Sequence, residues 1–289
     1  MPYPAKVLLF GEHTVLRGGR GLAVPYPRFS LAWADGEPDP RLLDFATYLA
    51  TLDTRFLDLP RMSAELAEGL RLTGNIPTGY GLGSSGAVCA AVLHRYGAAP
   101  VQQLGTRDLR QLLSHMEGFF HGQSSGTDPL VSYLQRPLLL HSGGAAGAVQ
   151  LPGGWQSGLF LIDTGVTRRA APLIERFLAA YDGDAAGQID RGWTQAADRA
   201  ITALGDGEQE VLGESFAQIS DFQLTHFPDF IPEPYRAFWN GGDRYRLKLC
   251  GAGGGGMLLG LAFDRAATEA VFREVQWLDA GMDEQPTSR

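Results

Sequence analysis

Cysteine is scarce in this chain, and its scarcity excludes two classes of protein. Only two cysteines occur among the 289 residues, Cys89 and Cys250. They lie too far apart for the ligand spacing of a zinc site, and a disulfide scaffold needs more of them. The cysteine content therefore favours the reducing environment of a cytoplasm.

Long apolar runs and an excess of basic residues are missing as well. No run reaches the roughly 18–20 apolar residues of a membrane helix, and residues 7–10 after Lys6 are too few for the core of a signal peptide. The net charge of −8 argues against nucleic acid as the main partner. We therefore expect a cytoplasmic protein without nucleic-acid or membrane partners. Nucleotide binding stays open, because a mononucleotide needs only a local positive pocket.

The composition is otherwise that of a globular protein, except that glycine is abundant. Apolar residues make up 44% and charged residues 19% of the chain, which is ordinary. Glycine occurs 38 times, well above its usual share of about 7%, and the glycines are clustered rather than spread evenly. Such clusters indicate loops that need unusual backbone conformations or a close approach to a ligand.

The mixture of strand and helix patterns, without a regular βαβ period, predicts a two-layer α+β fold. We expect strands at residues 5–10, 158–165, 245–250 and 257–263, a strand pair broken by Pro25 and Pro27 within 21–34, and strands around a turn at 131–140. We expect helices at residues 84–97, 106–122, 168–181, 184–204, 208–226 and 266–275, and mostly helix over 41–72. The glycine-rich residues 142–154 predict a loop between two domains, residues 1–150 and 151–289.

The clearest functional pattern is a glycine-rich loop that leads into a helix. Gly79, Gly81 and Gly83 alternate with other residues and are followed by Ser84 and Ser85. Such glycines let several backbone N–H groups point into one concavity, and the start of a helix adds free N–H groups and partial positive charge. Together they predict a polyphosphate site, with hydroxyls for phosphate or Mg²⁺. A flexible turn before a serine-capped helix is the alternative, and the spacing is neither that of a Walker A loop nor that of a Rossmann loop.

Two carboxylates follow at positions suited to phosphoryl transfer. Glu117 lies at the flank of an apolar helical stripe, and Asp128 lies in the short segment 124–129. Transfer of a phosphoryl group needs one carboxylate to position or deprotonate the attacking hydroxyl and another to hold Mg²⁺. A solvated Glu117 and an Asp128 that only caps a turn remain the alternatives.

Two further patterns lie near the ends of the chain. Five of the six residues 251–256 are glycine, more than a hairpin turn needs, which favours close approach of the backbone to a ligand or a loop over a floppy hairpin. Near the N-terminus, Lys6 begins an apolar run that ends at Gly11-Glu12-His13. This second pattern is weak by itself, because a lysine at the start of a strand is usually solvated.

Together these patterns resemble the three motifs of the GHMP kinases. Residues 6–13, 77–85 and 248–256 match the motifs in the family's order and span nearly the whole chain. The resemblance implies a two-domain α+β fold, with an N-terminal domain like ribosomal protein S5 and a C-terminal ferredoxin-like α/β domain. It also implies ATP and Mg²⁺ as cofactors. Within the family, residues 6–19 are similar to the mevalonate kinases.

The resemblance assigns roles to individual residues. Asp128 becomes the catalytic base or positioning acid, and Lys6 lowers the pKa of the attacking hydroxyl or stabilises negative charge. Ser85 and Glu117 become the Mg²⁺ ligands. The residues implied for ATP are Gly79, Gly81, Leu82, Gly83, Ser84, Ser85, Gly253 and Gly254, and those implied for the acceptor are Glu12, His13, Thr167, Gly251 and Ala252.

The predicted function is ATP-dependent phosphorylation of a small-molecule alcohol, with mevalonate converted to 5-phosphomevalonate. The carboxylate of mevalonate requires a cation, for which Arg168, Arg169 and His13 are candidates. Tyr80 and Gly86 depart from the usual family pattern and leave the acceptor open. A GHMP kinase for a sugar or another hydroxy acid, and a non-catalytic regulator on the same fold, are the alternatives. A homodimer is compatible with the sequence, which does not fix the oligomeric state.

Overall fold

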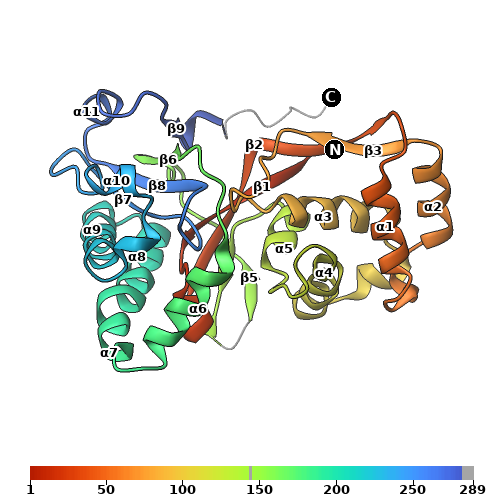
Figure 1. Ribbon diagram of the computed structural model, residues 1–289, viewed down its shortest axis with the longest axis horizontal. Helices are drawn as coiled ribbons and strands as arrows, with labels where there is room; N and C mark the ends of the chain where they lie inside the picture. Colours follow the sequence, from red (N-terminus) through yellow and green to blue (C-terminus); the bar gives the residue numbers. More distant parts are fainter. Residues whose placement is uncertain (143–144, 282–289) are drawn as a thin grey trace. The chain divides into compact units, whose positions relative to one another are not determined.

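The computed structural model describes residues 1–142 and 145–281 and divides into two compact units (Figure 1). The first unit consists of Met1–Lys6, Val24–Pro77 and Leu82–Arg136. The second consists of Val7–Ala23, Thr78–Gly81 and the described residues from Pro137 onward. The chain therefore enters each unit more than once. The division into residues 1–150 and 151–289 stays a prediction.

A five-stranded sheet has the order β1-β2-β4-β5, with β3 also paired to β2. Its strands are β1 (Tyr3–Phe10), β2 (Gly21–Asp35), β3 (Leu70–Gly74), β4 (Leu138–Leu140) and β5 (Ala146–Ala148). The strand expected at residues 5–10 is confirmed, but the strand pair expected within 21–34 is wrong, because β2 is continuous. On one side β2 pairs with β4 through residues 21–23 and with β3 through residues 31–35. Pro25 and Pro27 lie in the gap between these partners, where a missing N–H removes no bond to either.

The first unit holds five α-helices, and α3 packs against both α4 and α5 (Figure 1). The helices are α1 (Pro40–Leu49), α2 (Leu59–Ala67), α3 (Ser84–Tyr96), α4 (Thr106–His121) and α5 (Thr127–Leu134). The helices expected at 84–97 and 106–122 are confirmed. The strands expected at 131–140 are wrong in their first half, because residues 131–134 belong to α5. The β-branched Val131 favours a strand by propensity, but its burial in the packing of α5 against α3 stabilises the helix.

The second unit holds a four-stranded antiparallel sheet in the order β7-β8-β6-β9. Its strands are β6 (Leu159–Asp163), β7 (Tyr245–Leu249), β8 (Met257–Ala262) and β9 (Gln276–Trp277). Its helices are α6 (Ala170–Tyr181), α7 (Ala186–Ile189), the π-helix η5 (Asp190–Thr194), α8 (Gln195–Asp206), α9 (Gln209–His226), α10 (Glu233–Arg236) and α11 (Arg265–Glu269). The three strands and the helical stretches expected between 158 and 263 are confirmed, and α9 packs against β7.

Two expectations for the second unit are corrected. The helix expected at 266–275 ends at Glu269, because the chain then turns to place Phe272 against Tyr245, with ring centroids 5.0 Å apart. The loop expected at 142–154 contains β5, which pairs with β4. Residues 143–144 of that loop lie outside the described residues.

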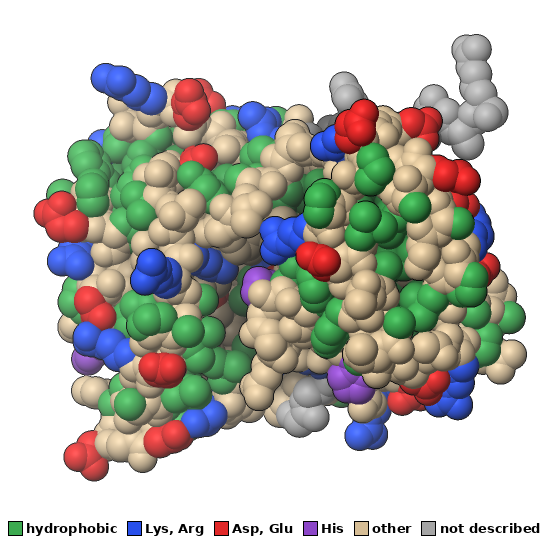
Figure 2. Space-filling model, turned by 45° about the vertical axis from the view of Figure 1, so that its right-hand side comes forward, with side chains coloured by type: hydrophobic (Ala, Val, Ile, Leu, Met, Phe, Trp, Pro, Cys, Tyr) green, Lys and Arg blue, Asp and Glu red, His purple; other side chains and the backbone are tan. Residues whose placement is uncertain are grey.

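Apolar side chains fill the interior of each unit, and charged side chains lie mostly at the surface. Figure 2 shows acidic and basic side chains interspersed on the face that it draws. None of the helices in the described part of the chain is both long and apolar enough to span a membrane. A few charged residues are buried instead, among them Lys6, Glu12, Glu117 and Lys248. They lie in the sites described next.

Candidate active site

The glycine-rich loop ends at the N-terminus of α3 in the first unit. Gly83 precedes the helix with a left-handed backbone (φ 74°), and no side chain caps the helix. The first N–H groups of α3 are therefore available to an anion. The N–H of Lys6 donates to the carbonyl of Leu82 at 2.9 Å, which fixes β1 beside the loop. A Cβ on Gly83 would lie 3.0 Å from Cγ of Lys6, so the lysine stem leaves little room for a side chain there.

Lys6 and Asp128 form an ion pair next to this helix start. Nζ of Lys6 lies 3.1 Å from Oδ1 of Asp128, which sits in the first turn of α5. The lysine side chain is only 7% exposed, whereas the aspartate is 33% exposed and stays within reach of a ligand. Gly86 allows this arrangement, because a Cβ there would lie 2.7 Å from the backbone N of Pro129. The departure from the family pattern at Gly86 thus has a structural reason: α3 and α5 approach closely.

Glu117 is buried in α4 and bound by two serines, so the alternative of a solvated flank residue is wrong. Its Oε1 accepts from the hydroxyl of Ser85 at 2.7 Å, and its Oε2 accepts from the hydroxyl of Ser124. Burial, followed by the negative charge of Asp128, raises the pKa of Glu117 to about 7. The site therefore holds a carboxylate whose charged form is disfavoured until a cation is near.

Sequence reasoning missed two members of this cluster. His121, one helical turn after Glu117 on α4, places Nε2 3.0 Å from Oγ of Ser85. Ser124 lies in the loop before α5. The spacing of four residues between Glu117 and His121 is a signal that could have found the histidine. Nothing in the sequence fixed which serine of residues 124–125 would turn toward Glu117.

In the second unit, His13 is held among aromatic rings. Its Nε2 lies 3.0 Å from the carbonyl oxygen of Ala252, and its ring centroid lies 5.0 Å from those of Phe177 and Phe230. Burial lowers the pKa of His13 to about 4, so the imidazole is neutral at pH 7 and Nε2 donates its proton to Ala252. Its backbone φ of 61° is unusual for a residue other than glycine.

Glu12 lies in a fully buried ion pair in the second unit. Nζ of Lys248 is 2.8 Å from Oε1 of Glu12 and also donates to the carbonyls of Leu9 and Leu249. The side-chain amide of Gln223 donates to the same Oε1 at 2.7 Å. These contacts fasten the Gly11-Glu12-His13 turn to β7. The predicted contact of Glu12 with an acceptor stays a prediction.

The glycines of residues 251–256 are required by close packing of loops, so the floppy hairpin is wrong. A Cβ on Gly253 would lie 2.6 Å from the carbonyl oxygen of Phe230, and one on Gly256 would lie 2.5 Å from that of Tyr80. Tyr80 thus meets this loop through its backbone.

Arg168 ties the same loops together. Its backbone N–H donates to the carbonyl of Gly79 at 3.1 Å, and its Nη1 donates to the carbonyl of Cys250 at 3.0 Å. The guanidinium fills the space that a side chain at Gly81 or Gly251 would need. Thr167 lies beside Gly79, where a Cβ would be 3.5 Å from the threonine Cβ. Among the residues predicted to bind ligands, the second unit brings together Gly79, Gly81, Glu12, His13, Thr167, Gly251, Ala252, Gly253 and Gly254.

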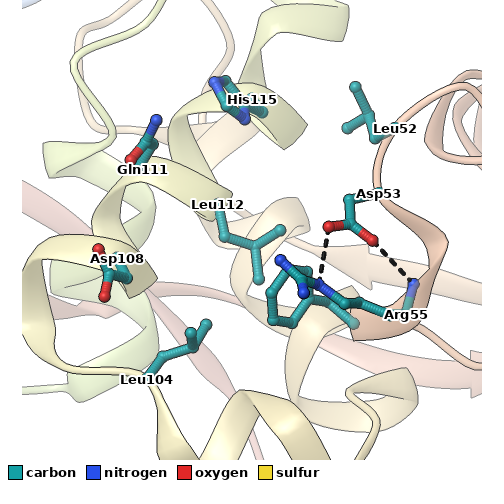
Figure 3. Close-up of a pocket in the computed structure, with 9 residues that line it drawn as sticks. Leu52, Asp53, Arg55, Leu104, Asp108, Gln111, Leu112 and His115 are labelled. Carbon is teal, nitrogen blue, oxygen red and sulfur yellow. Dashed lines mark hydrogen bonds and ion pairs between the residues drawn. The ribbon is translucent and has the colours of Figure 1, made fainter.

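A cavity of about 380 Å³ in the first unit contains none of the predicted site residues (Figure 3). It is lined by residues around the 3-10 helix η2 (Thr54–Phe56) and by one face of α4, including Leu112 and His115. The ion pair of Asp53 and Arg55 lies at its edge. At about 100° per residue, this face of α4 is opposite to the face that carries Glu117. The cavity is thus separate from the cluster at α3.

The chain resembles several known kinases. Residues 50–136 match the model of the GHMP kinases N terminal domain. A mevalonate kinase of Aeropyrum pernix is 27% identical over 232 residues, which cover 73% of this chain and 71% of that protein. The crystal structure of L. major mevalonate kinase in complex with R-mevalonate has a TM-score of 0.62 at 18% identity, covering 99% of this chain and 92% of the other. A Streptococcus pneumoniae phosphomevalonate kinase has a TM-score of 0.65 at 17% identity, covering 97% and 96%.

The protein is therefore an ATP-dependent small-molecule kinase with a two-domain α+β fold. More narrowly, residues 50–136 match the N-terminal domain of the GHMP kinases, the family that the three sequence motifs resemble. The curated relatives that it matches carry the name mevalonate kinase, whereas the structural neighbours include kinases for other acceptors.

Proposed function

We propose that this kinase transfers the γ-phosphoryl group of MgATP to the primary hydroxyl of mevalonate. The observation that carries the chemistry is the ion pair of Lys6 and Asp128, at 3.1 Å, beside the uncapped N-terminus of α3. The helix start suits the phosphates, and the ion pair places a base and a cation next to them. Nucleotide binding without catalysis does not require a buried lysine in an ion pair with a carboxylate, which argues against a regulator.

The transfer itself follows from these groups. The hydroxyl oxygen attacks the γ-phosphorus in line, the new O–P bond forms, and the bond to the bridging oxygen of ADP breaks. Asp128 accepts the hydroxyl proton. Lys6 orients Asp128 and stabilises the negative charge that develops on the attacking oxygen. Most of the acceleration is positioning and electrostatics, because little covalent chemistry is required of the protein.

Ser85 and Glu117 are the residues that would hold Mg²⁺. Their hydroxyl and carboxylate oxygens are the hard ligands that this ion prefers. Burial, followed by the charge of Asp128, raises the pKa of Glu117, and a nearby cation would stabilise its charged form. Within the described residues no group of three or more acidic, histidine or cysteine side chains could hold a metal. That fits an ion that takes one or two protein ligands and completes its shell with phosphates and water. When bound, Mg²⁺ neutralises charge on the phosphates.

The pKa of Glu117 predicts a pH-dependent metal affinity. Only the carboxylate binds a cation, and the carboxyl group is protonated below about pH 7 in the metal-free protein. We therefore expect the Mg²⁺ concentration for half-maximal activity to rise as the pH falls from 8 to 6, at saturating ATP and acceptor. Glu117→Gln, which does not titrate, removes this dependence. The same dependence in wild type and variant would exclude Glu117 as its source.

For the acceptor carboxylate we favour Arg168 over His13. His13 has a pKa of about 4 and carries no charge at pH 7. Arg168 is always charged, and its guanidinium is fixed by the carbonyl of Cys250. We propose Arg168 for the carboxylate, and the acceptor contacts predicted for Glu12, His13, Thr167, Gly251 and Ala252 stay predictions.

Mevalonate is favoured as the acceptor by the curated relatives and by residues 6–19. The test is coupled ADP release with MgATP and either mevalonate, phosphomevalonate, galactose or homoserine. We expect turnover with mevalonate alone. Turnover with galactose or homoserine instead would support the kinase activity but show that mevalonate is not the acceptor. Silence with all four would favour the non-catalytic regulator.

A further inference from the structure

The loop that connects α4 to α5 is fastened to α4 by several side chains of the first unit. The hydroxyl of Ser114 donates to the carbonyl of Ser124 at 2.6 Å, and Nε of Arg110 donates to the carbonyl of Ser125 at 2.7 Å. Gly126 ends the loop in a left-handed conformation (φ 70°) directly before α5. The loop therefore has a defined position relative to α4.

Ser124 turns its hydroxyl from this fixed loop toward Glu117. The N–H of Gly126 donates to Oγ of Ser124 at 2.9 Å, and Oγ in turn donates to Oε2 of Glu117. The backbone N–H of Gly126 thus orients the Ser124 hydroxyl, and the hydroxyl proton points to Glu117. The other oxygen, Oε1, faces the hydroxyl of Ser85. The carboxylate of Glu117 is therefore held from both ends.

We propose that Ser124 is a positioning residue of the metal site, which holds Oε2 of Glu117 so that Oε1 and the Ser85 hydroxyl present themselves to Mg²⁺. The inference rests on the proposed function, because it takes Glu117 as a metal ligand. It adds a residue that the sequence motifs did not assign. Partners that orient a metal ligand typically change metal affinity or activity about 10–100-fold when they are removed.

The same contact links the metal site to the base. Ser124 lies four residues before Asp128, and the short loop between them runs into the first turn of α5. The bond from Ser124 to Glu117 thus joins the loop that carries Asp128 to the helix that carries the metal ligand. A bond between these two segments helps to keep the distance between Asp128 and the metal ligand Glu117 constant.

The test measures metal binding directly rather than turnover. Mn²⁺ binding is followed by electron paramagnetic resonance in the presence of the non-hydrolysable β,γ-imido analogue of ATP. We expect Ser124→Ala to weaken Mn²⁺ binding about 10–100-fold and Ser124→Thr, which keeps the hydroxyl, to retain it. Ser132→Ala is the matched control, because Ser132 is a buried serine of the same unit whose hydroxyl donates to the carbonyl of Pro4 rather than to Glu117.

The outcomes separate this inference from the proposed function. If Glu117→Gln weakens Mn²⁺ binding and Ser124→Ala does not, the positioning role is wrong and the metal ligand stands. If neither variant weakens it, both are wrong. Thermal unfolding without metal completes the test: a lower melting temperature for Ser124→Ala with unchanged Mn²⁺ affinity would make the serine purely structural. Equal loss in Ser124→Thr would also overturn the role of the hydroxyl.

Discussion

Replacing Asp128 by asparagine should lower kcat by about 10²–10⁴-fold, the range for loss of a general base. The amide keeps the size of the side chain but cannot accept the proton of the attacking hydroxyl. Because Asp128 is one-third exposed and lies in the first turn of α5, we expect the fold to tolerate the change. The measurement is steady-state turnover at saturating MgATP and mevalonate, together with the Kd of the ATP analogue, which should stay close to that of the wild type.

Asp108→Asn is the matched control for this variant. Asp108 is also an aspartate in the first turn of a helix of the same unit, but it lies on the face of α4 that lines the cavity of Figure 3. The control should turn over like the wild type. Retained turnover in Asp128→Asn would show that Asp128 is not the base. An equal loss of turnover in Asp128→Asn and Asp108→Asn would indicate a general effect of the substitution.

The second large effect is expected at Lys6. Lys6→Met keeps an unbranched stem of similar length but removes the charge next to Asp128. Loss of one preorganised group that stabilises developing charge typically lowers kcat by about 10²–10³-fold. We expect that loss in kcat for Lys6→Met with only a small change in the KM for mevalonate, because the charge acts mainly in the transition state.

An exposed cation of the same unit serves as the control for Lys6. Arg55 also forms an ion pair with an aspartate, Asp53, but its side chain is 70% exposed and belongs to no part of the proposed site. Arg55→Met should leave kcat and KM unchanged. A rise of KM in Lys6→Met without loss of kcat would assign Lys6 to ground-state binding of the acceptor rather than to the chemical step.

The sequence predicted the parts of the fold and site that depend on neighbouring residues. The helix from Ser84 to Tyr96 and the loop before it follow from alternating glycines and a run of small apolar residues. The stripe of α4 placed Glu117 at the flank of a buried face. Such local patterns predict which residues are close along a helix, but they do not predict what covers that face.

The rest depended on contacts between segments far apart in the chain. Residues 131–134 favour a strand by themselves and are helical because α3 covers them. Burial of Glu117 depends on Ser85 and Ser124, which approach it from two other segments. Likewise, the neutrality of His13 follows from the second unit's aromatic rings, which come from residues more than a hundred positions away. No spacing rule in the sequence predicts these charge states.

The most direct test of the account is to identify the product by ³¹P NMR after incubation with MgATP and mevalonate. Coupled ADP release reports loss of the γ-phosphoryl group, whereas NMR reports where that group goes. We predict a phosphomonoester signal coupled to the protons of the terminal CH₂ group of mevalonate, which Asp128→Asn forms about 10²–10⁴-fold more slowly. Inorganic phosphate as the only new signal besides those of ADP, or formation of the ester by the variant at the wild-type rate, would contradict this prediction.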